Sequence, residues 1–313
     1  MTLGVGLFVE ANASAGAEAS VLGRGASVDA VRGVMIWQQQ VRGIPVLMRR
    51  VDGRTSRVPG MRPVRPDSGF RSLDLGEDEK GRIVAVYILN CQLRRRCEGP
   101  YVADIRAGGE RRLALPKHRG CATVKSVSVW RDQIAYALRC PAAGRSGVYV
   151  ARNGRTRLVI PQTSGAAGEA SLADLGPGFV AAVSDGLGLQ IGSTDAPRCR
   201  ATVVAGGGDD LGPVAVTRGR ITWVREVRGD FGGVQTTLER RAIAPNCTPT
   251  PLGLPRELNA LVGDEAFVDG FAIVGKTLYV SADGTIFTTS LVAGSTHSRA
   301  VAGASRGWAW ASR

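Results

Sequence analysis

Lysine, histidine and aromatic residues are scarce in this chain of 313 residues. Only four of its 40 basic residues are lysines, it has two histidines, and 5% of its residues are aromatic. So few histidines leave little material for a histidine-based metal or general-base site, and so few aromatics argue against a platform that stacks nucleic acid bases. After its first residues the chain also lacks the run of about 18 uncharged apolar residues that a membrane-spanning helix needs.

Apolar residues and glycine, by contrast, are abundant. Hydrophobic residues make up 44% of the chain and charged residues 21%, with 42 glycines and 15 prolines. That composition supports a buried core with many turns and excludes a disordered or collagen-like chain. The net charge of +13 rests on arginine, which high-GC codon usage explains as readily as selection for a polyanionic partner does.

We expect the first 25 residues to lie outside the folded domain. Leu3–Val9 is an apolar run, and small residues spaced like a signal-peptidase site follow it. No basic residue precedes the run and Glu10 interrupts it. We therefore interpret residues 1–25 as a signal peptide shortened by a late start codon, with a disordered amino terminus as the alternative, and residues 26–313 as a single domain.

Two cysteine pairs are placed where hairpins would bring them together. Cys91 and Cys97 lie on either side of a short loop between two strand-like runs. Cys121 and Cys140 flank a hairpin whose predicted centre lies near residue 130.5, and residues opposite each other in such a hairpin come within bonding distance. We predict a disulfide in each pair.

Cys199 and Cys247 form the third candidate pair, and their bonding stays open. They recur at equivalent points of the motifs Ala-Pro-Arg-Cys and Ala-Pro-Asn-Cys, and equivalent positions of neighbouring repeats can lie too far apart to bond. Zinc is the rival interpretation of the cysteines, but no Cys-x-x-Cys pair is present. The cysteines therefore favour an oxidising compartment, either periplasmic or extracellular.

An internal repeat is the strongest pattern in the chain. A polar turn is followed each time by an apolar, β-rich run, as in Arg32-Gly33 before Val34–Trp37, and the turns recur at intervals of 41 to 51 residues, at positions 33, 81, 132, 178, 219 and 270. Repeats of about 47 residues divide residues 26–313 into about six units.

Each repeat has the pattern of four short strands joined by turns. One period is predicted to contain the strands Val124–Trp130, Gln133–Arg139, Gly147–Ala151 and Thr156–Ile160, and no helical apolar face separates them. Four antiparallel strands per repeat are typical of a β-propeller, in which radial repetition protects the edges of the sheets. We predict an all-β, six-bladed propeller, with seven blades as the alternative, and we expect Trp308 and Trp310 to lie in a closing strand.

The chain resembles the TolB-type six-bladed propellers of exported bacterial proteins. The resemblance is carried by blades such as Lys80–Tyr87 followed by Tyr101–Ile105, and it extends over nearly the whole chain at the level of the fold. It implies that the domain binds proteins or peptides, since such propellers are only sometimes catalytic. The aspartate-rich start of the blade motif of that family is blurred here.

No catalytic set stands out in the sequence. His118 and His297 lie in polar, turn-like segments and are expected to be solvated, and no Gly-x-Ser-x-Gly motif is present. Carboxylates recur near the blade turns and could hold a calcium ion at the mouth of the channel, although turns favour aspartate for their own reasons; these are Asp74, Glu77, Asp78, Asp209, Asp210, Asp264, Glu265 and Asp269. We expect no catalytic residue, no cofactor and no metal, and a propeller hydrolase or lyase with a cation at the channel mouth is the alternative.

Basic residues are concentrated in one part of the chain. Between Arg49 and Arg119 there are 17 basic and nine acidic residues, including Arg94, Arg95 and Arg96 on the loop that Cys91 and Cys97 flank. These three arginines are the predicted contact for an anionic partner, which could be an acidic protein, a cell-wall polymer or lipid headgroups, whereas a solvated outer face is the plainer alternative. We expect a monomeric binding scaffold and not a nucleic-acid-binding protein.

Overall fold

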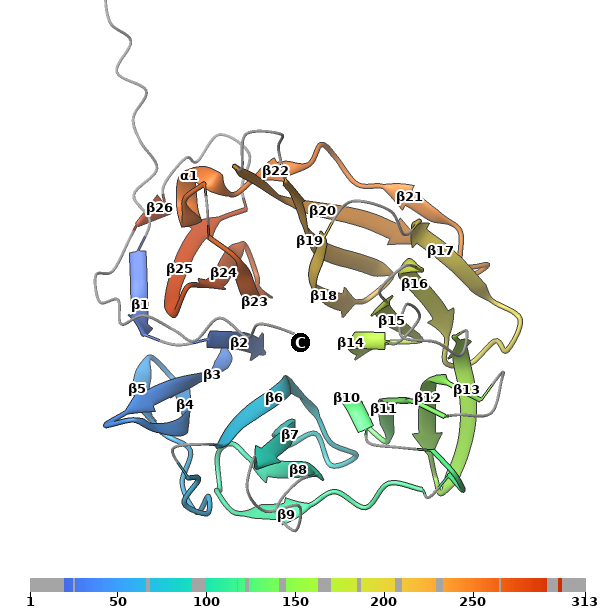
Figure 1. Ribbon diagram of the computed structural model, residues 1–313, viewed down its shortest axis with the longest axis horizontal. Helices are drawn as coiled ribbons and strands as arrows, with labels where there is room; N and C mark the ends of the chain where they lie inside the picture. Colours follow the sequence, from blue (N-terminus) through green and yellow to red (C-terminus); the bar gives the residue numbers. More distant parts are fainter. Residues whose placement is uncertain are drawn as a thin grey trace, which may run out of the picture.

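Six antiparallel sheets are arranged in a ring around one axis in the computed structural model of the chain (Figure 1). The model describes residues 20–299 except for positions 25, 66–67, 92–98, 117, 122–123, 141–144, 163–169, 185–186, 206–209, 229–232, 265 and 292–297. Each sheet is one blade of four strands, to which a fifth, short strand is added in two of the blades, and the ring confirms the prediction of an all-β, six-bladed propeller.

The first three blades are built from consecutive strands. Blade 1 contains β2 (Ala26–Val31), β3 (Val34–Val41), β4 (Ile44–Val51) and β5 (Arg54–Arg57); blade 2 contains β6 (Ser68–Glu77), β7 (Ile83–Cys91), β8 (Gly99–Asp104) and β9 (Glu110–Arg112); blade 3 contains β10 (Val124–Trp130), β11 (Gln133–Leu138), β12 (Gly147–Arg152) and β13 (Arg155–Pro161). The first strand of each blade lies nearest the axis (Figure 1).

The next two blades follow the same order. Blade 4 contains β14 (Ala170–Gly176), β15 (Phe179–Ser184), β16 (Gly188–Ser193) and β17 (Arg200–Val204); blade 5 contains β18 (Asp210–Thr217), β19 (Arg220–Arg228), β20 (Val234–Ile243) and β21 (Pro249–Pro251), with the short β22 (Arg256–Glu257) also paired to β20. The four-residue α1 (Asn259–Val262) is the one α-helix among the described residues, and none of them form a helix long and apolar enough to cross a membrane.

The sixth blade joins the two ends of the described chain. Its inner strands are β23 (Val268–Val274), β24 (Thr277–Ala282) and β25 (Thr285–Ser290), and its outer strand is β1 (Ser20–Arg24), while β26 (Ser298–Arg299) also pairs with β25. The amino-terminal strand therefore closes the ring, and blade 1 is complete without a carboxyl-terminal strand. Trp308 and Trp310 lie outside the described residues, as do residues 1–19 of the predicted signal peptide.

Two-residue turns explain why the repeat was visible in the sequence. Arg32 and Gly33 join β2 to β3 with φ angles of 49° and 76°, the left-handed pair that a tight hairpin between twisted strands requires. The predicted turn at Gly270 is wrong, because Gly270 lies inside β23 and the turn of that hairpin follows Val274. A Cβ at Gly270 would lie 2.9 Å from the backbone nitrogen of Val28, so this glycine serves the contact between blades 6 and 1.

The core lies between neighbouring blades. Phe70, Tyr87 and Tyr101 fill the space between blades 1 and 2, with ring centroids 5.1 Å apart for the first two and 6.0 Å for the last two. Trp37 and Trp223 are buried as well. Trp37 packs between blades 6 and 1, and Trp223 between blades 4 and 5.

Candidate functional site

Each inner strand has one edge that faces the channel and has no neighbouring strand. Its backbone N–H groups need another acceptor, and side chains of the preceding blade supply it. Asp29 of blade 1 accepts a hydrogen bond from the backbone N–H of Leu75 in blade 2. Asp74 of blade 2 accepts one from Val129 of blade 3, at 2.9 Å.

The same bond recurs around the ring. Ser128 Oγ accepts from Leu175 N at 2.8 Å, and Asp174 accepts from Val216 N. Blades 5 and 6 use side chains of their second strands, so that Glu226 accepts from Val268 N at 2.9 Å and Ser281 Oγ from Val28 N at 3.3 Å. Among the described residues, every interface between blades therefore has at least one such bond. We call it a clasp bond: an inner-strand N–H of one blade donates to a side-chain oxygen of the preceding blade.

The acceptors of three of these clasp bonds are aspartates, and they lie close to one another in the channel. Burial and the charge of Asp174 raise the pKa of Asp29 to about 7. Burial also raises the pKa of Asp174. The pKa of Asp74 is raised well above its ordinary value, first by burial and then by Asp174, which lies within hydrogen-bonding reach. Burial is the first cause for all three, because it disfavours the charged carboxylate, and for Asp29 and Asp74 the neighbouring carboxylates add to it.

The oxygens of these aspartates are already engaged. Asp29 accepts from the N–H of Leu75 with one oxygen and from that of Ala30 with the other, and Asp174 accepts from Val216 and from the Ser128 hydroxyl. In the part of the chain that the structure describes, no three His, Cys, Asp or Glu side chains are arranged to hold a metal ion.

Most of the carboxylates that the sequence singled out do not converge. Glu77 is buried and pairs with Arg32 at 2.6 Å, and Asp78 pairs with Arg82 at 2.6 Å in its own turn. Asp264 and Asp269 are exposed, and the positions of Asp209 and Glu265 and the side chain of Asp210 lie outside the description. Only Asp74 belongs to the channel group, whose other members, Asp29 and Asp174, sequence reasoning missed. Both lie four residues before the glycine of a hairpin turn, and that spacing is the signal that could have identified them.

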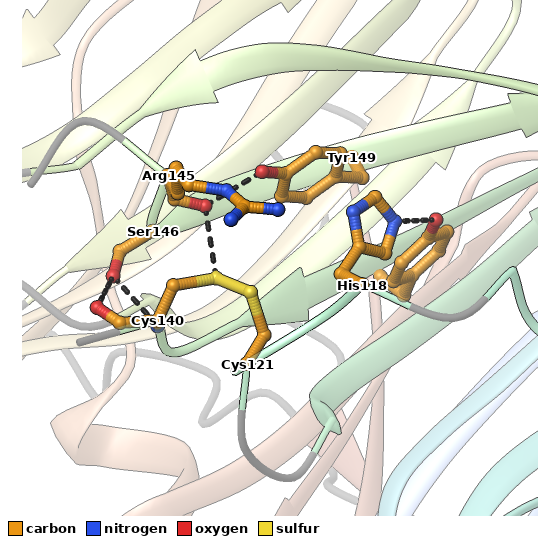
Figure 2. The surroundings of a disulfide bond; sticks show 7 residues. His118, Cys121, Cys140, Arg145, Ser146 and Tyr149 are labelled. Carbon is orange, nitrogen blue, oxygen red and sulfur yellow. Dashed lines mark hydrogen bonds between the residues drawn. A yellow bond between two sulfur atoms is a disulfide. The ribbon is translucent and has the colours of Figure 1, made fainter. Parts of the chain in front are cut away.

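Two disulfides are present among the described residues. Cys121 and Cys140 are bonded, as predicted, at an S–S distance of 2.02 Å (Figure 2). Cys199 and Cys247 are also bonded, with their Cα atoms 5.4 Å apart, and they join the β16–β17 turn of blade 4 to the β20–β21 turn of blade 5. Cys97 and the side chain of Cys91 lie outside the described residues.

The Cys121–Cys140 bond anchors the connection between blades 2 and 3. In Figure 2, His118 from this connection lies over the strands of blade 3, where its Nε2 is 2.9 Å from the Tyr136 hydroxyl and its ring centroid is 4.4 Å from that of Tyr149. His118 is thus a loop histidine, as expected, and it is partly exposed while its ring also contacts two tyrosines. Burial, followed by the charge of Arg145, lowers the pKa of His118, and His297 lies outside the described residues.

A cleft lies above this connection, between blades 2 and 3. Its apolar walls carry Val84, Val86, Val102 and Leu113 from blade 2 and Val129 and Ile134 from blade 3. Near the axis the two blades touch, since a Cβ on Gly76 would lie only 2.0 Å from the Val129 carbonyl oxygen. Further out, the interface opens into a space of about 570 Å³, which is lined also by charged side chains and by Ala107, Gly108 and Gly109. The valines themselves are buried in contact with one another, and aromatic rings fill the corresponding interface between blades 1 and 2.

The predicted contact residues Arg94, Arg95 and Arg96 lie outside the described residues, in the connection between β7 and β8. Blade 1 exposes other arginines. Arg54 and Arg57 lie on its outer strand, β5, whose four residues are all exposed, and Arg65 is exposed in the segment that leads to blade 2.

Comparisons with known proteins show the fold alone. No protein-family model matches the chain, and no curated protein matches it. A protein of unknown function from Dyadobacter fermentans DSM 18053 has a TM-score of 0.53 at 13% identity, over 87% of this chain and 97% of that one. A chain of the mitotic checkpoint complex has a TM-score of 0.50 at 12% identity, over 93% of this chain and 100% of that one.

A puromycin-hydrolysing peptidase from Mycobacterium tuberculosis also matches, with a TM-score of 0.46 at 13% identity, over 87% of this chain and 44% of the peptidase. The chain is thus a six-bladed β-propeller that shares its architecture with proteins of different kinds.

Proposed function

We propose that this propeller is an extracytoplasmic binding scaffold that takes an anionic partner on the arginine-rich outer side of blades 1 and 2. We further propose that it is TolB-like, that residues 1–25 include a signal peptide and that it works without a catalytic centre. Two disulfides among the described residues support an oxidising compartment, since thiols in the cytosol are kept reduced.

The observation that carries the proposal is a set of exposed arginines without acidic partners. Arg54, Arg57 and Arg65 are exposed, and none of them pairs with a carboxylate of the described residues. Other exposed arginines nearby are neutralised, as Arg82 is by Asp78. Exposed guanidinium groups that no carboxylate neutralises attract anions, because arginine binds carboxylate, sulfate and phosphate oxygens with two parallel N–H donors.

Arg94, Arg95 and Arg96 add to this surface in the proposal. They belong to the connection between β7 and β8 of blade 2, the blade next to blade 1. Three consecutive arginines in this connection add positive charge next to blade 2 in the sequence.

The alternative, a hydrolase or lyase with a cation in the channel, has one observation in its favour. Asp29, Asp74 and Asp174 lie near one another in the channel, although among the described residues no three such side chains are arranged to hold a metal ion. We rank it second because these carboxyl groups accept the clasp bonds of the backbone, and a cation would have to compete with those bonds.

Binding of fluorescent dextran sulfate at several salt concentrations tests the proposal. Affinity should fall steeply with salt, because exposed charges are screened over about 10 Å at 0.1 M salt. Replacing Arg54, Arg57 and Arg65 together by serine should weaken binding about tenfold, if each charge contributes about 0.5 kcal/mol.

A matched control removes the same charge from the opposite side of the ring. Arg198, Arg200 and Arg220 are also exposed, and their replacement by serine should change the affinity less than the blade 1 variant does. Equal losses in the two variants would mean a nonspecific charge effect and would overturn the assignment. An Arg94→Ser, Arg95→Ser, Arg96→Ser variant should bind more slowly at unchanged stability, within about 0.5 kcal/mol.

A further inference from the structure

Positive charge is concentrated in blade 3 and in the connection that leads to it. Between residues 113 and 168 the sequence contains nine lysines and arginines and one acid, Asp132. Asp132 lies in the β10–β11 turn, at the opposite end of β11 from the Cys121–Cys140 bond, and pairs there with Arg152 at 2.7 Å. At the disulfide end, Arg145 is exposed and pairs with no carboxylate of the described residues.

His118 and Arg145 face each other at the disulfide end of the blade. In Figure 2, the guanidinium of Arg145 is directed toward the His118 ring. Burial lowers the pKa of His118 and the charge of Arg145 lowers it further, so the two groups are close in space. Nε2 of His118 lies 2.9 Å from the Tyr136 hydroxyl, whereas Nδ1 has no hydrogen-bond partner among the described residues. Because a guanidinium can only donate hydrogen bonds, a protonated His118 and Arg145 both lack an acceptor here.

The surrounding structure holds both groups in place. The carbonyl oxygen of Arg145 accepts a hydrogen bond from the Tyr149 hydroxyl at 2.6 Å, and the hydroxyl of Ser146 donates to the carbonyl oxygen of Cys140 at 2.9 Å. The ring centroid of His118 lies 4.4 Å from that of Tyr149, and the disulfide ties the connection to the same blade. Groups that are already positioned lose little freedom when a ligand binds, which favours affinity.

The rings that contact His118 carry no negative charge. They belong to Tyr136 of β11 and Tyr149 of β12. Burial, followed by the effect of Tyr149, raises the pKa of Tyr136 to about 12, so its hydroxyl stays protonated, and the disulfide does not titrate. Protonation of His118 therefore brings two positive charges together, with no anion of the described residues to balance them.

We propose that Arg145 and His118 bind a free tetrahedral oxyanion, such as inorganic sulfate or phosphate, between the guanidinium and Nδ1. Arginine offers two parallel N–H donors to such an anion, and an anion beside the imidazole favours its charged form. Binding therefore takes up a proton at His118. This site on blade 3 goes beyond the proposed blade 1 surface and does not depend on it.

Proton NMR of the whole protein tests the site through the ring resonances of its histidines. The chain has two histidines, and a His297→Gln variant assigns their resonances. The probe is inorganic sulfate, which keeps its charge over the pH range of the titration, at an ionic strength held constant with sodium chloride. We expect a saturable change of the His118 resonance and a pKa of His118 that is about one unit higher in saturating sulfate. The affinity for sulfate should then be about tenfold higher in acid than in base.

Two arginine variants separate the site from a general effect of charge. Arg145→Gln should raise the pKa of His118 in the absence of sulfate, because a neighbouring positive charge is lost, and should weaken sulfate binding at least about tenfold. Arg155→Gln, which removes an exposed charge from the outer strand of the same blade, should leave the sulfate response of His118 as it is in the native chain.

Three outcomes would overturn the proposal. These are a His118 resonance that sulfate does not change in a saturable way, an equal response to sulfate in the Arg145→Gln variant, and an affinity that is the same in acid and in base. The serine variant of Arg54, Arg57 and Arg65 should keep the sulfate response of His118. The blade 1 proposal is therefore tested by dextran sulfate and this one by His118, so that either can fail without the other.

Discussion

The channel aspartates predict that the protein is more stable in mild acid than in mild base. The pKa of Asp29 rises from 3.8 to about 7 on folding, so between these values the folded chain holds a proton that the unfolded chain has released. The stabilisation that this proton gives is complete below the unfolded pKa and is lost as the pH rises through the folded pKa. The free energy of unfolding must therefore fall over this window.

The size of the effect follows from the shift. About three pKa units at about 1.4 kcal/mol each give about 4 kcal/mol in total, of which about 3 kcal/mol is lost between pH 5 and pH 8. Asp74 and Asp174 act in the same direction, because the pKa values of both are raised. His118 acts in the opposite direction, because its folded pKa is lowered and its contribution is lost as the pH falls.

Urea unfolding at pH 5, 6, 7 and 8 measures this slope. An Asp29→Asn variant should be less stable, because an amide cannot accept from both Leu75 and Ala30, yet its stability should vary less with pH. A His118→Gln background removes the opposing titration, and an Asp52→Asn variant, at a side chain 79% exposed, serves as the control. A free energy of unfolding that is constant or rises from pH 5 to pH 8, or an Asp29→Asn variant with the native slope, would refute the reasoning.

Two further predictions concern the contacts between blades. Removing the Cys199–Cys247 bond by replacing both residues with alanine should lower the free energy of unfolding by about 4 kcal/mol, because the bond spans 48 residues and closes a long loop in the unfolded chain. Denaturant unfolding measures this loss. An unchanged midpoint would show that the bond does not restrain the unfolded chain. Gly76→Ala should cost about 3 kcal/mol, because its Cβ would meet the Val129 carbonyl oxygen at 2.0 Å. Gly69→Ala, on the same strand with no atom within 4 Å of its Cβ, should be nearly neutral, and equal melting temperatures for the two alanine variants would contradict the close contact.

The sequence predicted the blades well because their turns are local. The strands of blade 3 lie within two residues of their predicted bounds, since tight turns and alternating apolar residues fix both. The turn at Gly270 was misplaced because a glycine required by a contact with another blade has the same appearance in the sequence as a glycine required by a turn. Closure of the ring by Ser20–Arg24 depends on pairing with Thr285–Ser290 across nearly the whole chain, which no local pattern encodes.

The candidate sites could be predicted only in part. Asp74 was named from the sequence, but its proximity to Asp174 depends on how the ring brings blades 2 and 4 together. The bond between Cys199 and Cys247 was left open because the distance between two turns on different blades follows from the packing of those blades. The cleft was not predicted, because no local sequence pattern indicates where two neighbouring blades diverge.

Hydrogen–deuterium exchange with and without dextran sulfate tests the central claim, that the partner surface lies on blades 1 and 2. Protection should appear in the peptides that contain Arg54–Arg57 and Arg65 and in the segment that contains Arg94, Arg95 and Arg96. It should be absent from the peptides of β17 and β18 on the far side of the ring (Figure 1). Protection confined to blades 4 and 5, or to the inner strands that carry Asp29 and Asp74, would contradict the account.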